Sequence, residues 1–221
     1  LEPHVALQLF QRMLTDANVT VLYGAQVAAV HKQGARILSV ETTDGTVVEG
    51  KVFIEAGYEG DLVYHSGVSY STGRESAATY NESLAGVTKG GPGNEFKVPI
   101  NPFATDGKPL PHISTAPKGE LGAADRKVQA YNFRLCVTRN SSNRVPFTEP
   151  EGYQAAEWEL LRRYYHAQGF SSLPSTNVAP VPNNKFDMNN GGPVSTDWIG
   201  GSWQYPDANY SARRQIWRQH R

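Results

Sequence analysis

The sequence has a single cysteine, Cys136, among its 221 residues. One cysteine excludes an internal disulfide and any cage of several thiolates around zinc or an iron–sulfur cluster. Because Cys136 lies in an apolar stretch, we expect it to be buried filler rather than a nucleophile. The six histidines form no His-x-x-x-His pair and there is no Gly-x-Ser-x-Gly elbow, which disfavours a zinc enzyme and a serine hydrolase.

Neither sign of charge is in excess. Lys plus Arg and Asp plus Glu number 21 each, so the formal net charge is zero. The lack of a basic block gives no electrostatic reason to expect a nucleic-acid partner. No apolar stretch approaches the roughly 20 residues that a membrane helix needs, so we expect no membrane-spanning segment. Sequons that would permit glycosylation, and so favour an extracellular location, lie at Asn18, Asn81, Asn140 and Asn209.

The first 60 residues predict a helix, a strand and a meander. Pro3 suits the first turn of a helix, and apolar residues recur at helical spacing over residues 3–17. Residues 19–23 follow as a short apolar run typical of a buried strand.

The meander follows in three runs. Residues 27–32 and 36–42 read as strands, and residues 46–54 follow Asp44-Gly45, a strong hairpin signal. The end of the last run, residues 52–54, is continuously apolar, as in a strand that enters a buried parallel sheet. This order predicts an α/β fold in which a doubly wound sheet carries an antiparallel meander. An isolated meander packed on a helix is the alternative.

The rest of the chain mixes irregular segments with single elements. Residues 86–122 are rich in Gly, Pro, Lys and Asn and predict a long irregular connection or a mobile flap. Residues 127–138 alternate as a strand, and residues 151–168 read as an amphipathic helix. Residues 171–204 are again rich in Pro, Asn and Gly.

Both ends of the sequence suggest a longer protein. The chain opens at Leu1 without a Met, and a helix that starts near Pro206 is still running at Arg221. A helix that ends without a stop signal is typical of a truncated sequence. We therefore expect an internal fragment.

The segment from Val52 to Leu62 carries the strongest chemical signal. An apolar strand ends in Glu55, which is followed by Ala56-Gly57 and then by Gly60-Asp61. Small residues at the carboxyl end of a strand let a ligand approach the backbone closely, and doubly wound sheets bind dinucleotides there. Free amides after such a turn can face phosphate oxygens. A plain strand–turn–helix connection that uses Gly for its geometry is the alternative.

This segment resembles the Asp-Ala-Thr-Gly turn, continuing Gly-Asp-Leu, of FAD-dependent oxidoreductases with the glutathione-reductase type of dinucleotide fold. Glu55 stands in place of the leading acid, and Gly57-Tyr58 in place of Thr-Gly. The resemblance to the branch often labelled FAD-dependent oxidoreductase or xanthan-lyase-like covers most of residues 2–220. Its other matching stretches are Glu2–Ala6, Val21–Val30, Gly67-Val68, Gly73–Glu75, Gln129–Leu135, Asn189–Gly191 and Ser195–Asp197.

The resemblance implies FAD as the cofactor and flavin-mediated hydride transfer as the reaction. It implies that Val27 contacts the adenine through its backbone. Ala56 and Gly57 would lie beside the pyrophosphate or the adenosine, while Gly60 and Asp61 would shape the start of the next helix. These five residues are the candidate cofactor-binding residues.

The resemblance also implies a division of the chain. Residues 1–65 would be the C-terminal part of an FAD-binding, Rossmann-like domain, and residues 66–221 an incomplete, mixed α+β substrate or cap region. The Gly-x-Gly-x-x-Gly loop would precede Leu1 and the segment that closes over the flavin would follow Arg221. We therefore expect the chain to hold FAD weakly and to be inactive alone.

Asn132 and Arg134 are the candidate substrate residues. They share the polar face of the strand predicted at 127–138. The family resemblance turns that face towards the flavin or the substrate, where an arginine could bind an anionic group. In the alternative, both side chains meet water. The sequence names no catalytic residue, and the substrate is an unidentified small or sugar-like molecule.

A non-catalytic carbohydrate-binding or structural domain is the second hypothesis. Flat apolar faces suited to sugars are offered by Trp158, Trp198, Trp203 and Tyr205. Scattered aromatic residues are equally typical of a core.

No metal site is predicted, because the spacing of the available oxygen ligands does not fit a 12-residue calcium loop; these ligands are Asp187, Asn189, Asn190 and Asp197.

Overall fold

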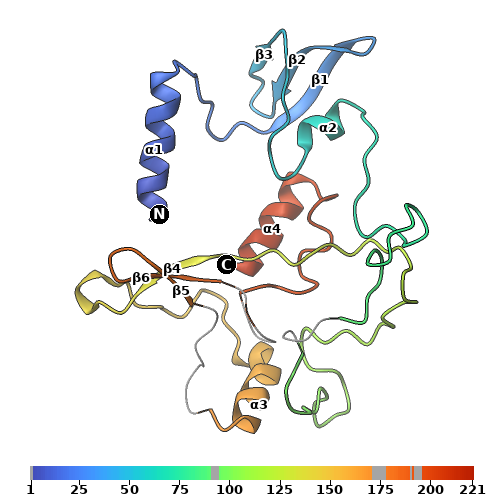
Figure 1. The fold of residues 1–221 in the computed structure, drawn as a ribbon, viewed down its shortest axis with the longest axis vertical. Coiled ribbons are helices and arrows are strands. Elements are labelled where there is room, and N and C mark those ends of the chain that lie inside the picture. Colours follow the sequence, from blue (N-terminus) through green and yellow to red (C-terminus); the bar gives the residue numbers. More distant parts are fainter. Residues whose placement is uncertain (1, 91–94, 171–177, 190, 192–195) are drawn as a thin grey trace. The chain divides into compact units, whose positions relative to one another are not determined.

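The computed structural model describes residues 2–90, 95–170, 178–189, 191 and 196–221 (Figure 1). These residues form helices and two small sheets. The chain divides into two compact units. The N-terminal unit is His4–Thr72, and the C-terminal unit is Gly73–Arg221 together with the residues up to Pro3.

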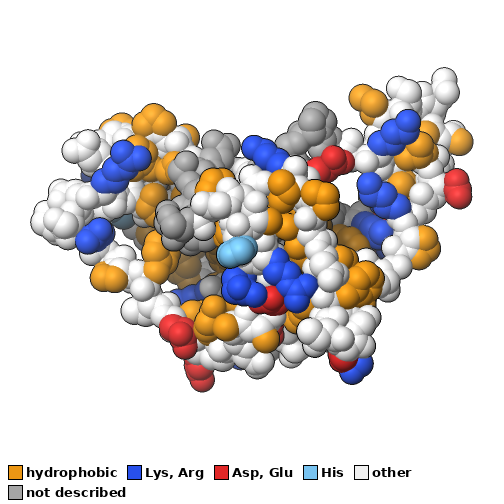
Figure 2. All heavy atoms as spheres, turned by 90° about the horizontal axis from the view of Figure 1, so that it is seen from below, with side chains coloured by type: hydrophobic (Ala, Val, Ile, Leu, Met, Phe, Trp, Pro, Cys, Tyr) orange, Lys and Arg blue, Asp and Glu red, His pale blue; other side chains and the backbone are white. Residues whose placement is uncertain are grey.

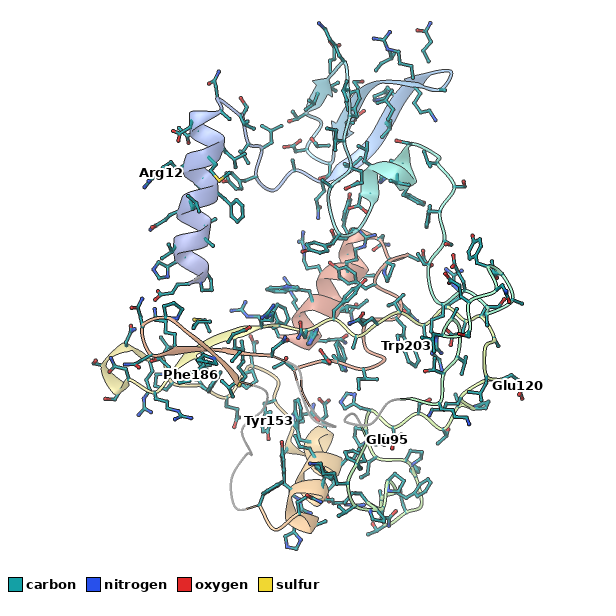
Figure 3. The ribbon with its side chains drawn as sticks, viewed as in Figure 1. Arg12, Glu95, Glu120, Tyr153, Phe186 and Trp203 are labelled. Carbon is teal, nitrogen blue, oxygen red and sulfur yellow. The ribbon has the colours of Figure 1, made fainter. Side chains whose placement is uncertain are left out.

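The first helix, α1 (Pro3–Asp16), confirms the helix predicted at the start of the chain. Pro3 is its first residue, where the missing N–H has no partner to lose. The apolar stripe is nevertheless exposed, since the side chains of Phe10 and Met13 are 62% and 56% accessible. Arg12 also projects from this helix (Figure 3). The helical period was right, but the burial that it implied is not present.

The meander of the N-terminal unit forms as predicted over its first two strands. It is an antiparallel sheet in the order β1 (Val27–Gln33), β2 (Arg36–Thr42) and β3 (Val47–Glu49). The Asp44-Gly45 turn is held by the Asp44 carboxylate. It accepts hydrogen bonds from Thr42 Oγ1 at 2.5 Å and from the Thr46 N–H at 3.0 Å.

One predicted strand of this unit is not formed, and the strand predicted at 46–54 is shortened. Residues 19–23 have no strand structure, and β3 ends at Glu49, before residues 52–54. Val52 and Ile54 are 76% and 79% exposed. A strand needs a neighbour that takes its backbone hydrogen bonds, and the sheet of the described N-terminal residues consists of β1, β2 and β3. Apolar composition alone does not make these segments strands, so that prediction was wrong.

A short helix, α2 (Asp61–His65), lies against β1. Gly60 precedes it with φ at +68°, a left-handed conformation that glycine adopts without the steric cost of a Cβ. The Lys32 ammonium donates a hydrogen bond of 2.5 Å to the Ser66 carbonyl oxygen and so ties the end of α2 to β1.

The C-terminal unit contains the second antiparallel sheet, in the order β4 (Leu135–Thr138), β6 (Lys185–Met188) and β5 (Val178–Val181). Figure 3 labels Phe186 on this sheet. Asn183 and Asn184 join β5 to β6 with φ values of 65° and 56°, a region that Asn tolerates better than most residues. The strand predicted at 127–138 is confirmed only for its last four residues, and Cys136 is exposed rather than buried.

The irregular segment predicted at 86–122 contains no helix or strand in its described residues, 86–90 and 95–122. It nevertheless supplies core residues, because Val87 and Leu110 are only 4% and 6% exposed. The Val87 N–H donates to the Ala123 carbonyl oxygen at 2.9 Å, and the Gly122 N–H donates to the Val87 carbonyl oxygen at 2.8 Å.

Most other apolar side chains reach solvent, and Figure 2 shows hydrophobic side chains at the surface among charged and polar ones.

The two helices of the C-terminal unit are shorter than predicted. A 3-10 turn at Ala155–Trp158 precedes α3 (Glu159–Ala167), so the helix predicted at 151–168 is confirmed in its second half. The last helix, α4 (Tyr210–His220), begins after Asn209, whose side-chain oxygen accepts a hydrogen bond of 2.9 Å from the Ala212 N–H. Another short 3-10 turn lies at Ser141–Asn143.

The fold is therefore of the mixed α/β class, with helices and two antiparallel sheets. Among the described residues, no helix has both the length and the apolar character needed to cross a bilayer.

Candidate cofactor-binding bend and substrate strand

The 55–61 bend, which is the segment between Glu55 and Asp61, is organised around one carboxylate. Glu55 Oε1 accepts a hydrogen bond of 2.6 Å from the Gly57 N–H, and Glu55 Oε2 accepts one of 2.9 Å from the Leu62 N–H. Hydrogen bonds from amides to a carboxylate are charge-assisted and stronger than those between neutral groups. One side chain thus ties the start of the bend to the first turn of α2.

The two glycines of the bend differ in their surroundings and in their backbone conformation. A Cβ at Gly57 would stand 2.9 Å from Glu55 Oε1, closer than real Cβ atoms approach a neighbour, so a larger residue here would displace the Glu55 carboxylate. Gly60 has open space around it but a left-handed φ. Asp61 opens α2, where a negative charge is favourable beside the positive end of the helix dipole.

The main chain of the bend is open to solvent. Ala56 and Gly57 are exposed, and Tyr58 is fully accessible. The exposed backbone at Gly57 is compatible with the close approach of a ligand that the sequence predicts here. The prediction of free amides was wrong at Gly57, because its N–H is already bonded to Glu55.

Val27 lies in the same compact unit as the bend. It is the first residue of β1, is half-buried, and faces Thr42 of β2 in the register of the sheet. The five candidate cofactor residues thus belong to one unit of the chain.

Arg134, a candidate substrate residue, is paired with Asp187 of β6. Its Nε donates to Asp187 Oδ1 at 3.2 Å, and a second guanidinium nitrogen donates to Oδ2. The hydrogen bonds from Arg134 lower the pKa of Asp187, and the same bonds raise the pKa of Arg134. The arginine side chain is 61% exposed, so its remaining donors can reach solvent or a ligand.

Asn132, the other candidate, lies where the chain approaches residues 196–198. Its side-chain amide donates to Asn189 Oδ1 at 2.6 Å, and its backbone forms an isolated bridge with Asp197. Asn132 is half-buried and Arg134 is exposed. Both belong to the segment that leads into β4, but they have separate partners. Asn190 and Ser195, which took part in the sequence resemblance, lie outside the described residues.

A histidine that the sequence did not single out lies beside Asn132. His220 Nε2 is 3.0 Å from the carbonyl oxygen of Thr196. Because a carbonyl only accepts, Nε2 carries the hydrogen. The ring of His220 packs against Phe133 and Trp198, with centroid distances of 5.0 and 5.7 Å. No spacing pattern signals this cluster, because its members lie far apart in the sequence. They come from the segment just before β4, from a loop and from the end of α4.

Three of the four aromatic residues considered for sugar binding have ring or cation partners within the chain; these are Trp198, Trp203 and Tyr205. Lys127 lies over the ring of Trp203, with its ammonium 4.8 Å from the centroid, and Tyr205 packs edge-on against Tyr131. Trp158 is 52% exposed.

The oxygen ligands considered for a metal are also engaged. Asp187 is bonded to Arg134, and Asn189 accepts from Asn132. No group of three His, Cys, Asp or Glu side chains that could hold a metal ion occurs in the part of the chain that the structure describes.

The fold places the chain in the mixed α/β class, and the bend at residues 55–61 is exposed. Residues 1–221, the whole chain, match the family model described as FAD dependent oxidoreductase. The chain belongs to this family, which confirms the resemblance seen in the sequence and makes FAD its cofactor. No curated protein and no solved structure matches the chain.

Proposed function

We propose that the chain serves flavin-mediated hydride transfer to or from a small-molecule or sugar-like substrate. The observation that carries this proposal is the open main chain at Ala56 and Gly57, on a bend that Glu55 holds in place. FAD supplies the hydride chemistry when it is bound, and the protein supplies binding and orientation. Membership of the FAD-dependent oxidoreductase family supports the same reaction class.

The proposed cofactor-binding roles come from the family resemblance, and the exposure of Ala56 and Gly57 supports two of them. Ala56 and Gly57 let the cofactor lie against bare backbone, and Gly60 with Asp61 sets the direction of α2. Val27 contributes its backbone at the start of β1. Because the Gly57 N–H is already bonded, we assign Gly57 to the adenosine side rather than to the pyrophosphate.

The proposed organisation has two parts. Residues 1–65 belong to a doubly wound FAD-binding domain, and residues 66–221 form a substrate or cap region. The order of helix and meander in the N-terminal unit supports this division. The exposed apolar side chains at 19–23 and 52–54 are what a sheet covered on both faces would bury.

The proposed substrate is a small molecule, and neither a nucleic acid nor a membrane is proposed as a partner. Arg134 would bind an anionic group on the substrate, because Asp187 occupies only part of its five-donor guanidinium. Asn132 would contact a neutral polar group. Arg134→Ala should then remove any preference for acidic over neutral sugars in ligand binding. Arg144→Ala, at another exposed arginine, should leave that preference unchanged.

Titration of the chain with FAD tests the proposed function. We expect a saturable change in flavin fluorescence that adenosine diphosphate suppresses by competition. Retention on a polysaccharide column without any response to FAD would favour the carbohydrate-binding alternative and contradict the proposal.

An extracellular location is also proposed, on the sequons alone. The side chain of Asn209 caps α4 and that of Asn140 accepts from the Ser142 N–H at 3.1 Å. Asn18 and Asn81 are exposed. Expression through a secretory host should therefore place glycans first at Asn18 and Asn81, as read by mass spectrometry.

A further inference from the structure

The Glu55 carboxylate makes two contacts that join residues far apart along the bend. It accepts from Gly57, two residues on, and from Leu62, seven residues on. Glu55 is half-buried, whereas Ala56, Gly57 and Tyr58 are exposed. The side chain thus lies on the inner side of the bend, and the open main chain lies on the outer side.

The first half of the bend has no regular secondary structure. Ala56, Gly57 and Tyr58 belong to no helix or strand, and glycine has the largest conformational freedom of all residues. The helix that follows has only five residues, too few to be stable without outside contacts. Two charge-assisted hydrogen bonds from one side chain therefore have a large effect on which main-chain conformations are populated.

Only a carboxylate can make both bonds. Its two oxygens are acceptors, so each can take an amide N–H. A glutamine has the same length but one carbonyl oxygen and one NH₂ group, and the NH₂ group would face an N–H donor. An aspartate keeps both acceptors but is one methylene shorter.

We propose that Glu55 is a positioning residue for the cofactor: it holds the main chain of Ala56 and Gly57 in the conformation that FAD meets. This inference rests on the proposed function, because it assigns a role within the same site. Glu55 acts through the backbone of the bend. The Gly57 N–H stays with Glu55 when FAD binds, so the contact is made by the open backbone surface and not by this donor.

The test compares Glu55→Gln with Glu49→Gln, which removes the same charge from an exposed position on β3. Three quantities are measured on the full chain: the dissociation constant for FAD, the melting temperature, and amide hydrogen exchange at Gly57 and Leu62. FAD binding is measured well below the melting temperature, so that every variant is folded.

Glu55→Gln should weaken FAD binding by about tenfold or more, the change expected when a hydrogen bond to a charged group is lost. The Gly57 and Leu62 amides should exchange faster, and Glu49→Gln should match the unchanged chain in all three measurements. A purely structural role would lower the melting temperature but leave the FAD affinity of the folded protein unchanged. Glu55→Asp should give an intermediate affinity.

The outcomes separate the inference from the proposed function. If the unchanged chain shows no saturable FAD binding, the proposed function fails and the inference fails with it. If the chain binds FAD and Glu55→Gln binds it equally well, only the inference is overturned. Should Glu55→Gln not fold, wild-type FAD affinity in Glu55→Asp overturns the inference instead.

Discussion

Gly57 lies directly against the carboxylate of Glu55. The two are joined by a hydrogen bond of 2.6 Å, and a Cβ added at Gly57 would stand only 2.9 Å from the same oxygen. A small residue at position 57 thus leaves the Glu55 carboxylate in place, and it also leaves room for the cofactor that is proposed to lie on the bend. A substitution here changes the bend before any ligand arrives.

Larger side chains at position 57 should weaken FAD binding in order of size. Gly57→Ala forces Glu55 to shift by a few tenths of an ångström, and Gly57→Val also crowds the open backbone. We expect about a tenfold loss of FAD affinity for the valine variant and a smaller loss for alanine, since overpacking typically costs about 1–3 kcal/mol. Flavin titration measures the affinities. Equal flavin content in all three proteins would contradict the role given to this bend.

Gly86 should be among the glycines least tolerant of substitution in the C-terminal unit. Its φ is +73°, and an added Cβ would stand 2.6 Å from the carbonyl oxygens of both Gly122 and Ala123. Since these are backbone atoms, the chain itself must move. We expect Gly86→Ala to lower the free energy of unfolding by about 3 kcal/mol, from the left-handed strain and the overlap together.

Gly107 provides the matched control for Gly86. Its φ is +80°, also left-handed, but nothing lies within 4 Å of its ideal Cβ. Gly107→Ala should therefore cost only the conformational strain, about 1–2 kcal/mol. Denaturant unfolding of both variants measures the difference. Equal losses would mean that the contacts between residues 86–87 and 122–123 are not tight in solution.

The sequence predicted those elements whose signal is local. The helical period of α1, the alternation of β1 and β2, and the Asp44-Gly45 turn all depend on neighbouring residues, and all are present. Residues 19–23 and 52–54 were mispredicted because a strand depends on a partner that composition does not reveal. The β5–β6 hairpin was missed because its strands are short. The adjacent Asn183 and Asn184 were its available signal.

The site was predicted only in part for a similar reason. Small residues after an acid signalled an open bend, and the bend is open at Ala56 and Gly57. The two hydrogen bonds of Glu55 depend on how its side chain folds back, which no spacing rule encodes. The pairing of Arg134 with Asp187 joins residues 53 positions apart, and it became visible only once β4 and β6 were paired.

Tyr164 should be a major core residue of the C-terminal unit. It is 4% exposed, lies on α3, and packs against Phe96 with a centroid distance of 4.8 Å. Tyr164→Ala should lower the free energy of unfolding by about 3–4 kcal/mol, the range for removal of a buried aromatic ring. Tyr80→Ala, at a residue that is 67% exposed, should change it by less than about 0.5 kcal/mol. Similar melting temperatures for the two variants would refute the packing of α3.

The pair formed by Arg74 and Asp125 should make stability depend on acid pH. Arg74 Nε donates to Asp125 Oδ1 at 2.9 Å, and the two residues also exchange backbone hydrogen bonds of 2.8 and 3.1 Å. The hydrogen bonds from Arg74 lower the pKa of Asp125 below its ordinary value. A carboxyl whose folded pKa is depressed stabilises the protein above its unfolded pKa of about 3.9, and this contribution is lost as the pH falls through the folded pKa.

Two variants isolate that effect. Asp125→Asn removes the titrating group. Below about pH 4, the free energy of unfolding of this variant should therefore fall less steeply with pH than that of the unchanged chain. Arg74→Ala keeps the group and removes the donor, so the Asp125 pKa should return towards its ordinary value, as read by NMR titration of the carboxyl carbon. The backbone hydrogen bonds between residues 74 and 125 remain in both variants. They keep the two segments in register, so only the side-chain pair is changed. An unchanged Asp125 pKa in Arg74→Ala would show that the pair does not form in solution.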